Sequence, residues 1–304
     1  MQVIKPVPIT TITSSNVPEP DIARGEPDYW NDSTVYDVGD EVIYEHDIWR
    51  SVDDGVVGIV PGTDPLKWFH VKATNKYSCV DGVITNQCLA PEDENLVFSF
   101  EANRITKIGL LNVRGSSVTL TLDVDEDGQW VQMWEQTYSL LENDSRSWWE
   151  YFFNPAIFRS DLIADIPRYI DIRLTVTITP LMGQAALGHT VVGNMVWIGE
   201  TLYGASPSII DYSRKDVDSQ GNYYLKQGRW SKRANIPVHI TTMDMDRVFR
   251  LMAQVRGKAV LWVGVDEEGL QFDSLIIYGF YREFSPVISG PVKSEYSLEI
   301  EGLT

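Results

Sequence analysis

The sequence contains few side chains that commonly carry out covalent chemistry. Its 304 residues include only two cysteines and four histidines. No histidine lies in an HExxH spacing or near a cysteine in a zinc-ligand pattern, and the GxSxG, P-loop and GxGxxG motifs do not occur. The sequence therefore predicts a protein that is not an enzyme, with no catalytic residues, no metal and no cofactor.

The two cysteines, Cys79 and Cys88, are too few for a disulfide-stapled secreted domain. We expect both thiols to be reduced and structural. The alternative is a bridge between them, because a hairpin around Asp81-Gly82 would bring the two residues together.

Long apolar runs and positive charge are also scarce. No run of about 18 apolar residues occurs, so we expect no membrane span. The opening stretch MQVIKPVPITTITSSNVPEP lacks the basic start and apolar block of a signal peptide, so we expect folding in a cytosol. The 25 Lys and Arg face 43 Asp and Glu, for a formal charge of -18. Such a surface repels phosphate backbones, so nucleic acid is not an expected partner.

Helix-forming residues do not dominate the composition, whereas Val, Ile, Thr, Tyr and Trp recur in short runs typical of strands. The sequence predicts a mainly β protein in four parts. Residues 1–20 form an extended N-terminal arm, 21–75 a small aromatic β module, 76–199 a β-sandwich, and 200–304 an α+β domain with one helix on antiparallel strands.

The N-terminal arm combines Pro6, Pro8, Pro18 and Pro20 with β-branched apolar residues. Proline favours extended chain, and the apolar residues suit neither a helix nor open water. We expect this segment to be extended and packed on another chain; a solvated tail is the alternative.

The middle of the chain shows the alternation of a sheet with one wet face, in SVTLTLDV and YIDIRLTVTI. Between strands, DVDEDGQW matches the opening of a calcium-binding EF-hand loop. The match fails at its twelfth position, where Trp134 replaces the required glutamate. We therefore predict a hairpin turn at Asp125-Glu126-Asp127-Gly128.

One helix is expected near the C-terminus, in MDMDRVFRLMAQVRG. Its apolar face would consist of five residues, Met245, Val248, Phe249, Met252 and Val255. Asp244 can cap its start and Gly257 can end it. Strands follow in AVLWVGV, SLIIYGFY and EYSLEIEGL, with a hairpin turn at 266–269.

Two groups of residues are candidates for binding. Trp30, Tyr36, Trp148 and Trp149 are candidates for stacking on a glycan, and the last two lie in SWWEYFF, which could equally form an inter-domain or inter-subunit contact. The basic segment 214–233 would bind either phosphate or nucleic acid or, as we expect, acidic surface on a neighbouring subunit. Its candidate assembly contacts are Arg229, Lys232 and Arg233.

The small module resembles the chitin-binding modules of carbohydrate-binding families 5 and 12. The matching residues are Gly39, Asp40, Val42, Tyr44, Trp49, Pro61, Gly62 and Trp68. Those modules usually expose aromatic residues after the second strand, whereas SVDDGVVGIV contains none. We expect Tyr44, Trp49 and Trp68 to form the module's core, and glycan binding is the alternative.

The wider layout resembles tailed-bacteriophage virion proteins. The shared features are the Val-Ile-Lys-Pro start, the Pro-Glu-Pro stretch, the module, TNKYSCVDGVITNQ, and the ending YGASPSIIDYSRKD to YGFYREFS and SEYSLEIEGL. The resemblance implies a multi-copy structural component of the tail, baseplate or fibre-attachment region. Its expected partners are other virion proteins and copies of itself, and its location is a virion assembled in the host cytoplasm. A host-surface glycan-binding adhesin is the alternative.

Overall fold

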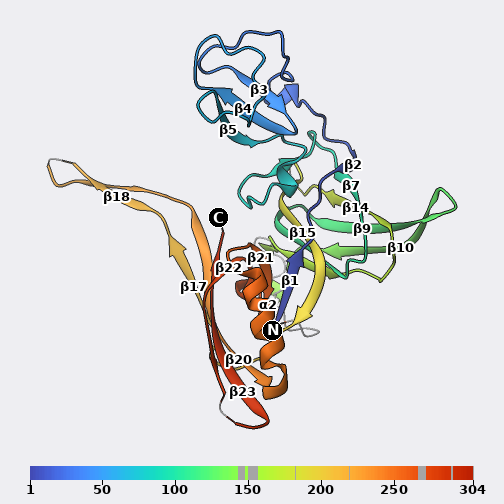
Figure 1. The fold of residues 1–304 in the computed structure, drawn as a ribbon, viewed down its shortest axis with the longest axis vertical. Helices are drawn as coiled ribbons and strands as arrows, with labels where there is room; N and C mark the ends of the chain where they lie inside the picture. Colours follow the sequence, from blue (N-terminus) through green and yellow to red (C-terminus); the bar gives the residue numbers. More distant parts are fainter. Residues whose placement is uncertain are drawn as a thin grey trace.

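The computed structural model describes residues 1–142, 148–149, 157–181, 183–218, 220–265, 272–288 and 290–303. The chain is mostly antiparallel β structure, and α2 (Met245–Val255) is the one α-helix with described bounds, so the predicted fold class is confirmed. Figure 1 shows a β body with a small module above it and long strands that project on either side.

The small module is a three-stranded antiparallel sheet of β3 (Glu41–Tyr44), β4 (Asp47–Ser51) and β5 (Trp68–Ala73). Trp68 is buried in its core, as expected, and its indole N–H donates to the Ile59 carbonyl at 2.8 Å. The ring of half-buried Trp49 lies so close to the Pro61–Gly62 turn that a side chain at Gly62 would meet it at 3.1 Å. Aromatic rings therefore form the core of this module together with the buried aliphatic residues Val42 and Val56.

A buried carboxylate fastens this module to the body. The side chain of Glu19, before the turn η1 (Ile22–Arg24), is 5% exposed and accepts hydrogen bonds from His46 Nδ1 at 3.0 Å and Thr74 Oγ1 at 2.8 Å. The His46 ring, on the β3–β4 turn, stacks on Tyr77 with the centroids 3.7 Å apart. Polar and stacking contacts thus hold the module in one place.

The second sheet has five strands. Their order is β10 (Gln129–Ser139), β9 (Ser117–Glu126), β14 (Ile172–Thr179), β7 (Leu96–Ala102) and β2 (Ile12–Ser15). The first predicted alternating run lies wholly in β9, and the second forms β14 from Ile172 onward, with buried apolar residues alternating along both strands. The start of the second run is not strand, and Ile170 is 55% exposed. Asp127 and Gly128 have φ of 54° and 82°, and the Asp125 carboxylate accepts a hydrogen bond from Gly128 N. The predicted hairpin turn is confirmed.

The largest sheet runs through the whole body. Its main path is β13 (Leu162–Asp165), β8 (Lys107–Arg114), β15 (Ala186–Trp197), β1 (Gln2–Pro6), β21 (Val260–Val263), β22 (Ile276–Val287), β23 (Lys293–Gly302), β20 (Trp230–Thr241) and β16 (Glu200–Thr201). In addition, β6 (Cys88–Leu89) pairs with β15, and β17 (Ser206–Asp211) pairs with β20. The predicted parts 76–199 and 200–304 therefore share one sheet.

β1 joins the two halves of this sheet. It pairs with β15 on one side and with β21 on the other, and Ile4 lies opposite both Met195 and Leu261. Val3 and Ile4 point to opposite faces, and both are completely buried. The expectation that residues 1–20 pack on another chain is wrong for β1, because its apolar residues fill the chain's own cores. β2 also pairs within the chain, with β7.

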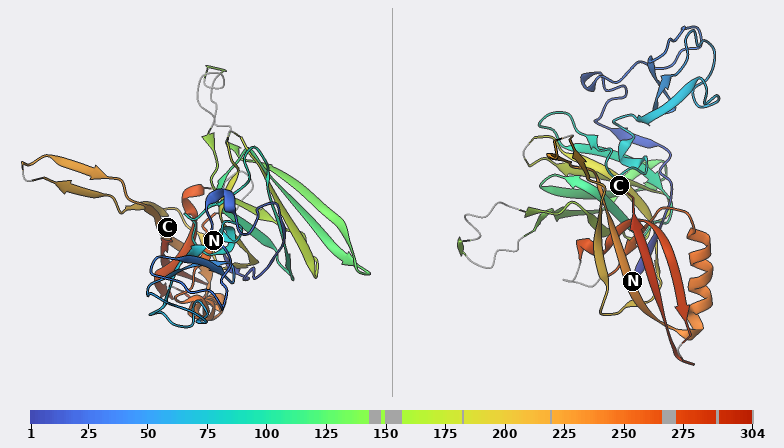
Figure 2. Two further views of the ribbon diagram at one scale, coloured as in Figure 1. Left: turned by 90° about the horizontal axis from the view of Figure 1, so that it is seen from above. Right: turned by 90° about the vertical axis from the view of Figure 1, so that its left-hand side faces the viewer.

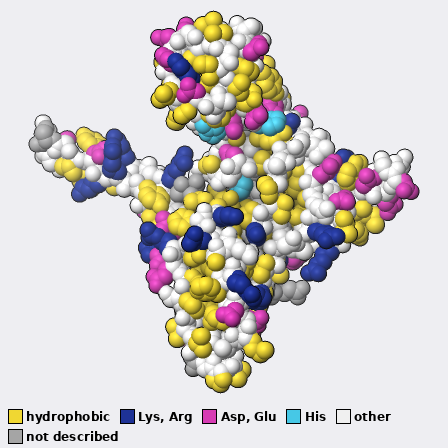
Figure 3. All heavy atoms as spheres, viewed as in Figure 1, with side chains coloured by type: hydrophobic (Ala, Val, Ile, Leu, Met, Phe, Trp, Pro, Cys, Tyr) yellow, Lys and Arg dark blue, Asp and Glu magenta, His cyan; other side chains and the backbone are white. Residues whose placement is uncertain are grey.

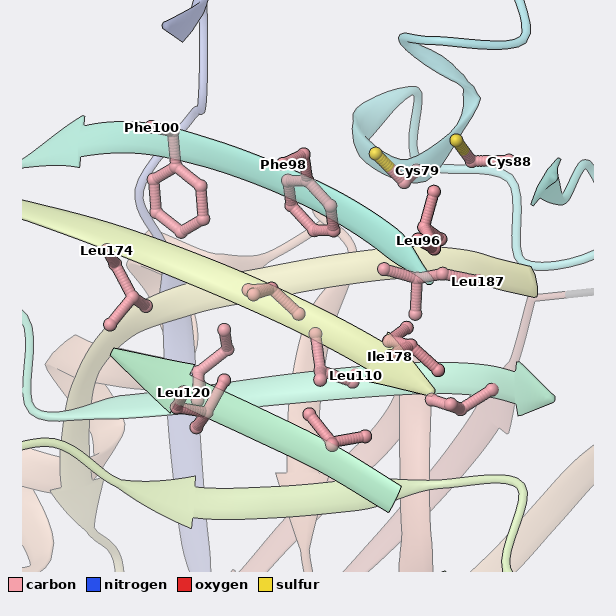
Figure 4. Close-up of a cluster of buried hydrophobic side chains, with 14 of the residues drawn as sticks. Cys79, Cys88, Leu96, Phe98, Phe100, Leu110, Leu120, Leu174, Ile178 and Leu187 are labelled. Atoms are coloured by element: carbon pink, nitrogen blue, oxygen red, sulfur yellow. The ribbon is translucent and has the colours of Figure 1, made fainter. Parts of the chain in front are cut away.

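The main core lies between the five-stranded sheet and the β8–β15 part of the large sheet. Figure 4 shows Phe98, Phe100 and Leu96 of β7 facing Leu110 of β8 and Leu187 of β15. The turn η2 (Ser78–Val80) and β6 close one end of this core. Cys79 and Cys88 meet there as buried free thiols, in agreement with the prediction.

α2, preceded by η3 (Thr242–Asp244), lies against the C-terminal half of the large sheet (Figure 1). Four of its five predicted apolar-face residues are buried, but Phe249 is 55% exposed and contacts only the border of the core through Phe284. The placement of Phe249 in the core is therefore wrong. The Asp244 carboxylate makes no capping bond and instead accepts from Thr241 Oγ1. Gly257 has φ of +68° and follows the helix end, as predicted.

Five short elements complete the description. β11 (Leu141–Glu142) pairs with β12 (Ile157–Phe158), and η4 (Asp273–Leu275) precedes β22. β18 (Arg214–Val217) pairs with β19 (Tyr223–Lys226). The hairpin turn expected at 266–269 lies outside the described residues.

Candidate functional site

A long hairpin leaves the body between β17 and β20 and ends in the β18–β19 pair. We call residues 206–229 the arm, which is distinct from the N-terminal arm of residues 1–20. In Figures 1 and 2 it extends well away from the rest of the chain. Arg214 lies opposite Lys226, and Val217 opposite Tyr223. At the tip, the Asp218 carboxylate accepts hydrogen bonds from the Asn222 side-chain amide and from the backbone N–H of Asn222 and Gln220. These bonds, that of the Asn222 amide above all, lower the pKa of Asp218.

The arm exposes apolar side chains instead of burying them. Those with more than half of their surface exposed are Ile209, Tyr212, Val217, Tyr223, Tyr224 and Leu225, and Trp230 at the base is similarly exposed. A two-stranded ribbon has no core of its own and is marginally stable by itself. A concentration of exposed apolar residues marks a surface that binds another molecule. The arm is therefore the strongest candidate for an interaction site.

Basic residues lie among these apolar side chains (Figure 3). Arg214 and Lys226 both contact the carboxylate of Asp216 at 3.0 Å. Lys215 Nζ lies 4.8 Å from the centroid of the Tyr223 ring. The arm holds four Lys and Arg against three Asp, in a chain whose formal charge is -18. The arm thus differs in charge from the acidic remainder of the protein.

The three predicted assembly contacts have different positions. Arg229 is exposed at the base of the arm. Lys232 is half-buried, and its ammonium group donates to Asp161 Oδ2 at 2.6 Å and to the carbonyls of Asp273 and Ile276 at 2.8 and 3.2 Å. Three bonds use all the donors of an ammonium group. Lys232 therefore connects β20 to the segments before β13 and β22 within the chain.

Arg233 also has a partner within the chain, because its guanidinium pairs with Glu299 on the neighbouring strand β23. Of the three predicted contacts, the structure leaves Arg229 exposed, alongside Lys215 farther out on the arm.

The glycan candidates of the module serve its interior. Tyr36 is buried, meets Trp68 edge-to-face at 5.5 Å, and its hydroxyl accepts a hydrogen bond from Asn31 N. Trp30 is half-buried and meets Tyr44 edge-to-face at 5.7 Å. Burial leaves the Tyr36 ring no open face for a sugar, whereas the Trp30 ring keeps part of its surface exposed.

Trp148 and Trp149 are 80% and 69% exposed and have helical backbone. The three aromatic residues that follow, at positions 151–153, lie outside the described residues.

Sequence reasoning identified the charges of the arm but missed the exposed aromatic and aliphatic residues of β19, namely Tyr223, Tyr224 and Leu225. The sequence feature that could have revealed these exposed residues is the absence of apolar–polar alternation in YYLK, residues 223–226. A strand that packs one face on a core alternates apolar and polar residues, whereas consecutive apolar residues in a polar hairpin place an apolar side chain on each face.

The described residues contain no group of three or more His, Cys, Asp and Glu that could hold a metal ion. Within the described ranges, no helix is both long enough and apolar enough to cross a membrane. A scan against protein-family models found no match, and a search of curated proteins found none.

Proposed function

We propose that this protein is a non-enzymatic structural component of a bacteriophage tail, baseplate or fibre-attachment assembly, where several copies act together. The observation that carries this proposal is the arm, which places apolar side chains on both of its faces in solvent. Ordering such a hairpin costs conformational entropy that its own contacts repay poorly. A neighbouring protein that covers it supplies the missing contacts.

The sequence resemblance to tailed-bacteriophage virion proteins supports the kind of assembly. A multi-copy particle lets one modest contact contribute many times. The small module adds an outward-facing unit, and the continuous large sheet lies between the module and the arm. The protein would be made in the host cytoplasm and end in the virion, with copies of itself and other virion proteins as partners.

The test is a double change on the arm, Tyr224→Ser/Leu225→Ser, with Leu66→Ser as the control. Leu66 is 78% exposed on the small module, so its change removes a comparable exposed apolar group elsewhere. Mass photometry should show oligomers for the parent and the control and a shift to monomer for the arm variant. The parent protein should also be detected in purified virions by mass spectrometry. A protein that is monomeric at every concentration and absent from virions would refute the proposal.

Glycan binding is a second candidate function, favoured by the exposure of Trp148 and Trp149. Exposed indole rings stack on sugar faces. A glycan array with the full chain and with Trp148→Ala/Trp149→Ala tests it. Binding that disappears in the variant supports an adhesin role, and absence of binding to any bacterial or chitin-like glycan rejects it.

A further inference from the structure

A second hairpin projects from the opposite side of the molecule. β9 and β10 extend beyond their neighbour β14, since Ile172 at the start of β14 lies opposite Val124 and the hairpin continues through Asp127-Gly128. Figures 1 and 2 show this hairpin and the arm pointing away from each other. The two projections of one copy therefore cannot reach each other, but each can reach another molecule.

The two hairpins differ in charge. The β9–β10 hairpin, residues 117–139, contains five carboxylates and no Lys or Arg. These residues are Asp123, Asp125, Glu126, Asp127 and Glu135. In Figure 3 acidic atoms cover the tip of this hairpin, whereas basic atoms lie along the arm. Opposite charges on two protruding surfaces favour their association and steer their approach.

The two hairpins also share an apolar component. Val131 and Met133 of β10 are 38% and 43% exposed. β10 is the edge of its sheet, and among the described residues no strand pairs with its outer side. An open edge strand with exposed apolar side chains is a ready site for another chain. The arm, with Tyr224 and Leu225 exposed, offers apolar groups of the same kind.

We propose that the arm of one copy binds the β9–β10 hairpin of a second copy, head to tail. This inference rests on the proposed function in that it names the partner of the arm. Because the contact joins two different surfaces, a pair of copies still has one unused arm, on one copy, and one unused hairpin, on the other. Such heterologous contacts generate a ring when the rotation closes and a filament when it does not.

The acidic hairpin fits the arm better than nucleic acid does. Two of the four cations of the arm share the carboxylate of Asp216, which leaves Lys215 and Arg229 for a partner. Two cations suit a compact acidic hairpin tip better than a long phosphate backbone, which needs many positive charges. The rest of the chain is strongly acidic and repels phosphate. A second copy, in contrast, supplies the three carboxylates of residues 125–127 at the tip of a projecting hairpin, and two more carboxylates along its strands.

The experiment uses charge reversal on exposed residues that leave the turns and cores intact. The arm variant is Lys215→Glu/Arg229→Glu, and the hairpin variant is Glu126→Lys/Glu135→Lys; all four side chains are exposed. A control, Arg250→Glu on the exposed surface of α2, introduces the same kind of charge change away from both hairpins. Circular dichroism first confirms that each variant is folded.

Sedimentation velocity then measures self-association at about 50 mM and about 500 mM salt, where screening differs strongly. We expect each reversed variant alone to associate at least about tenfold more weakly than the parent at low salt, because like charges then face each other. An equal mixture of the two variants should recover association, since each reversed surface meets its complement. A chain that carries all four changes should recover it too, and Arg250→Glu should behave like the parent.

Three results would overturn the contact. The reversed variants could associate like the parent, the mixture could fail to recover association, or the parent could stay monomeric. A parent that assembles while the charge changes have no effect would refute only this contact and leave the proposed function standing. Binding of a double-stranded DNA oligonucleotide that is lost in Lys215→Glu/Arg229→Glu, without self-association, would assign the arm to nucleic acid instead.

Discussion

We expect His189 to make the stability of the protein fall as the pH drops from about 8 to about 5. His189 lies on β15, is 6% exposed, and accepts a hydrogen bond at Nδ1 from Gly82 N. Its ring lies 4.9 Å from that of Tyr278. Burial lowers the pKa of His189 from 6.5 to about 4. The folded protein therefore holds this imidazole neutral, whereas the unfolded chain takes up a proton at higher pH.

The size of the effect follows from the two pKa values. The folded value lies below the unfolded value, so protonation of the unfolded chain lowers stability as the pH falls through 6.5, and the loss levels off below about 4. A tenfold difference in proton affinity corresponds to about 1.4 kcal/mol, so the full loss is about 3 kcal/mol. At about pH 5 some 2 kcal/mol of it is already present.

Urea unfolding of the parent and of His189→Gln at about pH 8 and about pH 5 measures this loss. The glutamine cannot take up a proton, so the stability of the parent relative to the variant should fall by about 2 kcal/mol at the lower pH. The comparison at the higher pH accounts for lost packing. Burial raises the pKa of Asp81, which acts in the opposite direction, but Asp81 is present in both proteins and cancels. An equal pH dependence in the two proteins would refute the reasoning.

Two further predictions concern the cores. Ile4→Ala should lower the free energy of unfolding by about 2–5 kcal/mol, because Ile4 is completely buried between β15 and β21. Val7 is exposed, so Val7→Ala is the control. Equal small losses for the two variants in urea unfolding would contradict the central position of β1. Cys79 and Cys88 are both buried, and the neighbouring Cys88 thiol and burial raise the pKa of Cys79. Both should therefore react with a thiol reagent such as DTNB only in denaturant. Rapid reaction in the folded state would show that these thiols are accessible.

Residue type and spacing were enough to predict the local elements. Alternation in SVTLTLDV and YIDIRLTVTI required strands with one buried face, and the structure has them at 117–126 and 172–179. Helical spacing and Gly257 set α2 and its end. The small module needed its aromatic rings for packing, and Trp68 is buried. These features depend on interactions between residues close in the chain, where residue type and spacing carry the information.

The positions of these elements relative to one another depend on the tertiary fold. The prolines and β-branched residues of 1–20 indicated extended chain, but they could not show that β1 completes the chain's own sheet, because its partners β15 and β21 lie far away in sequence. The sequence predicted Lys232 as a surface contact, but in the folded chain its ammonium group pairs with Asp161, which is distant in sequence. The opposite directions of the arm and the β9–β10 hairpin likewise depend on the sheets that hold them. Long-range pairing has no local signature, so these arrangements emerge only when the chain is folded.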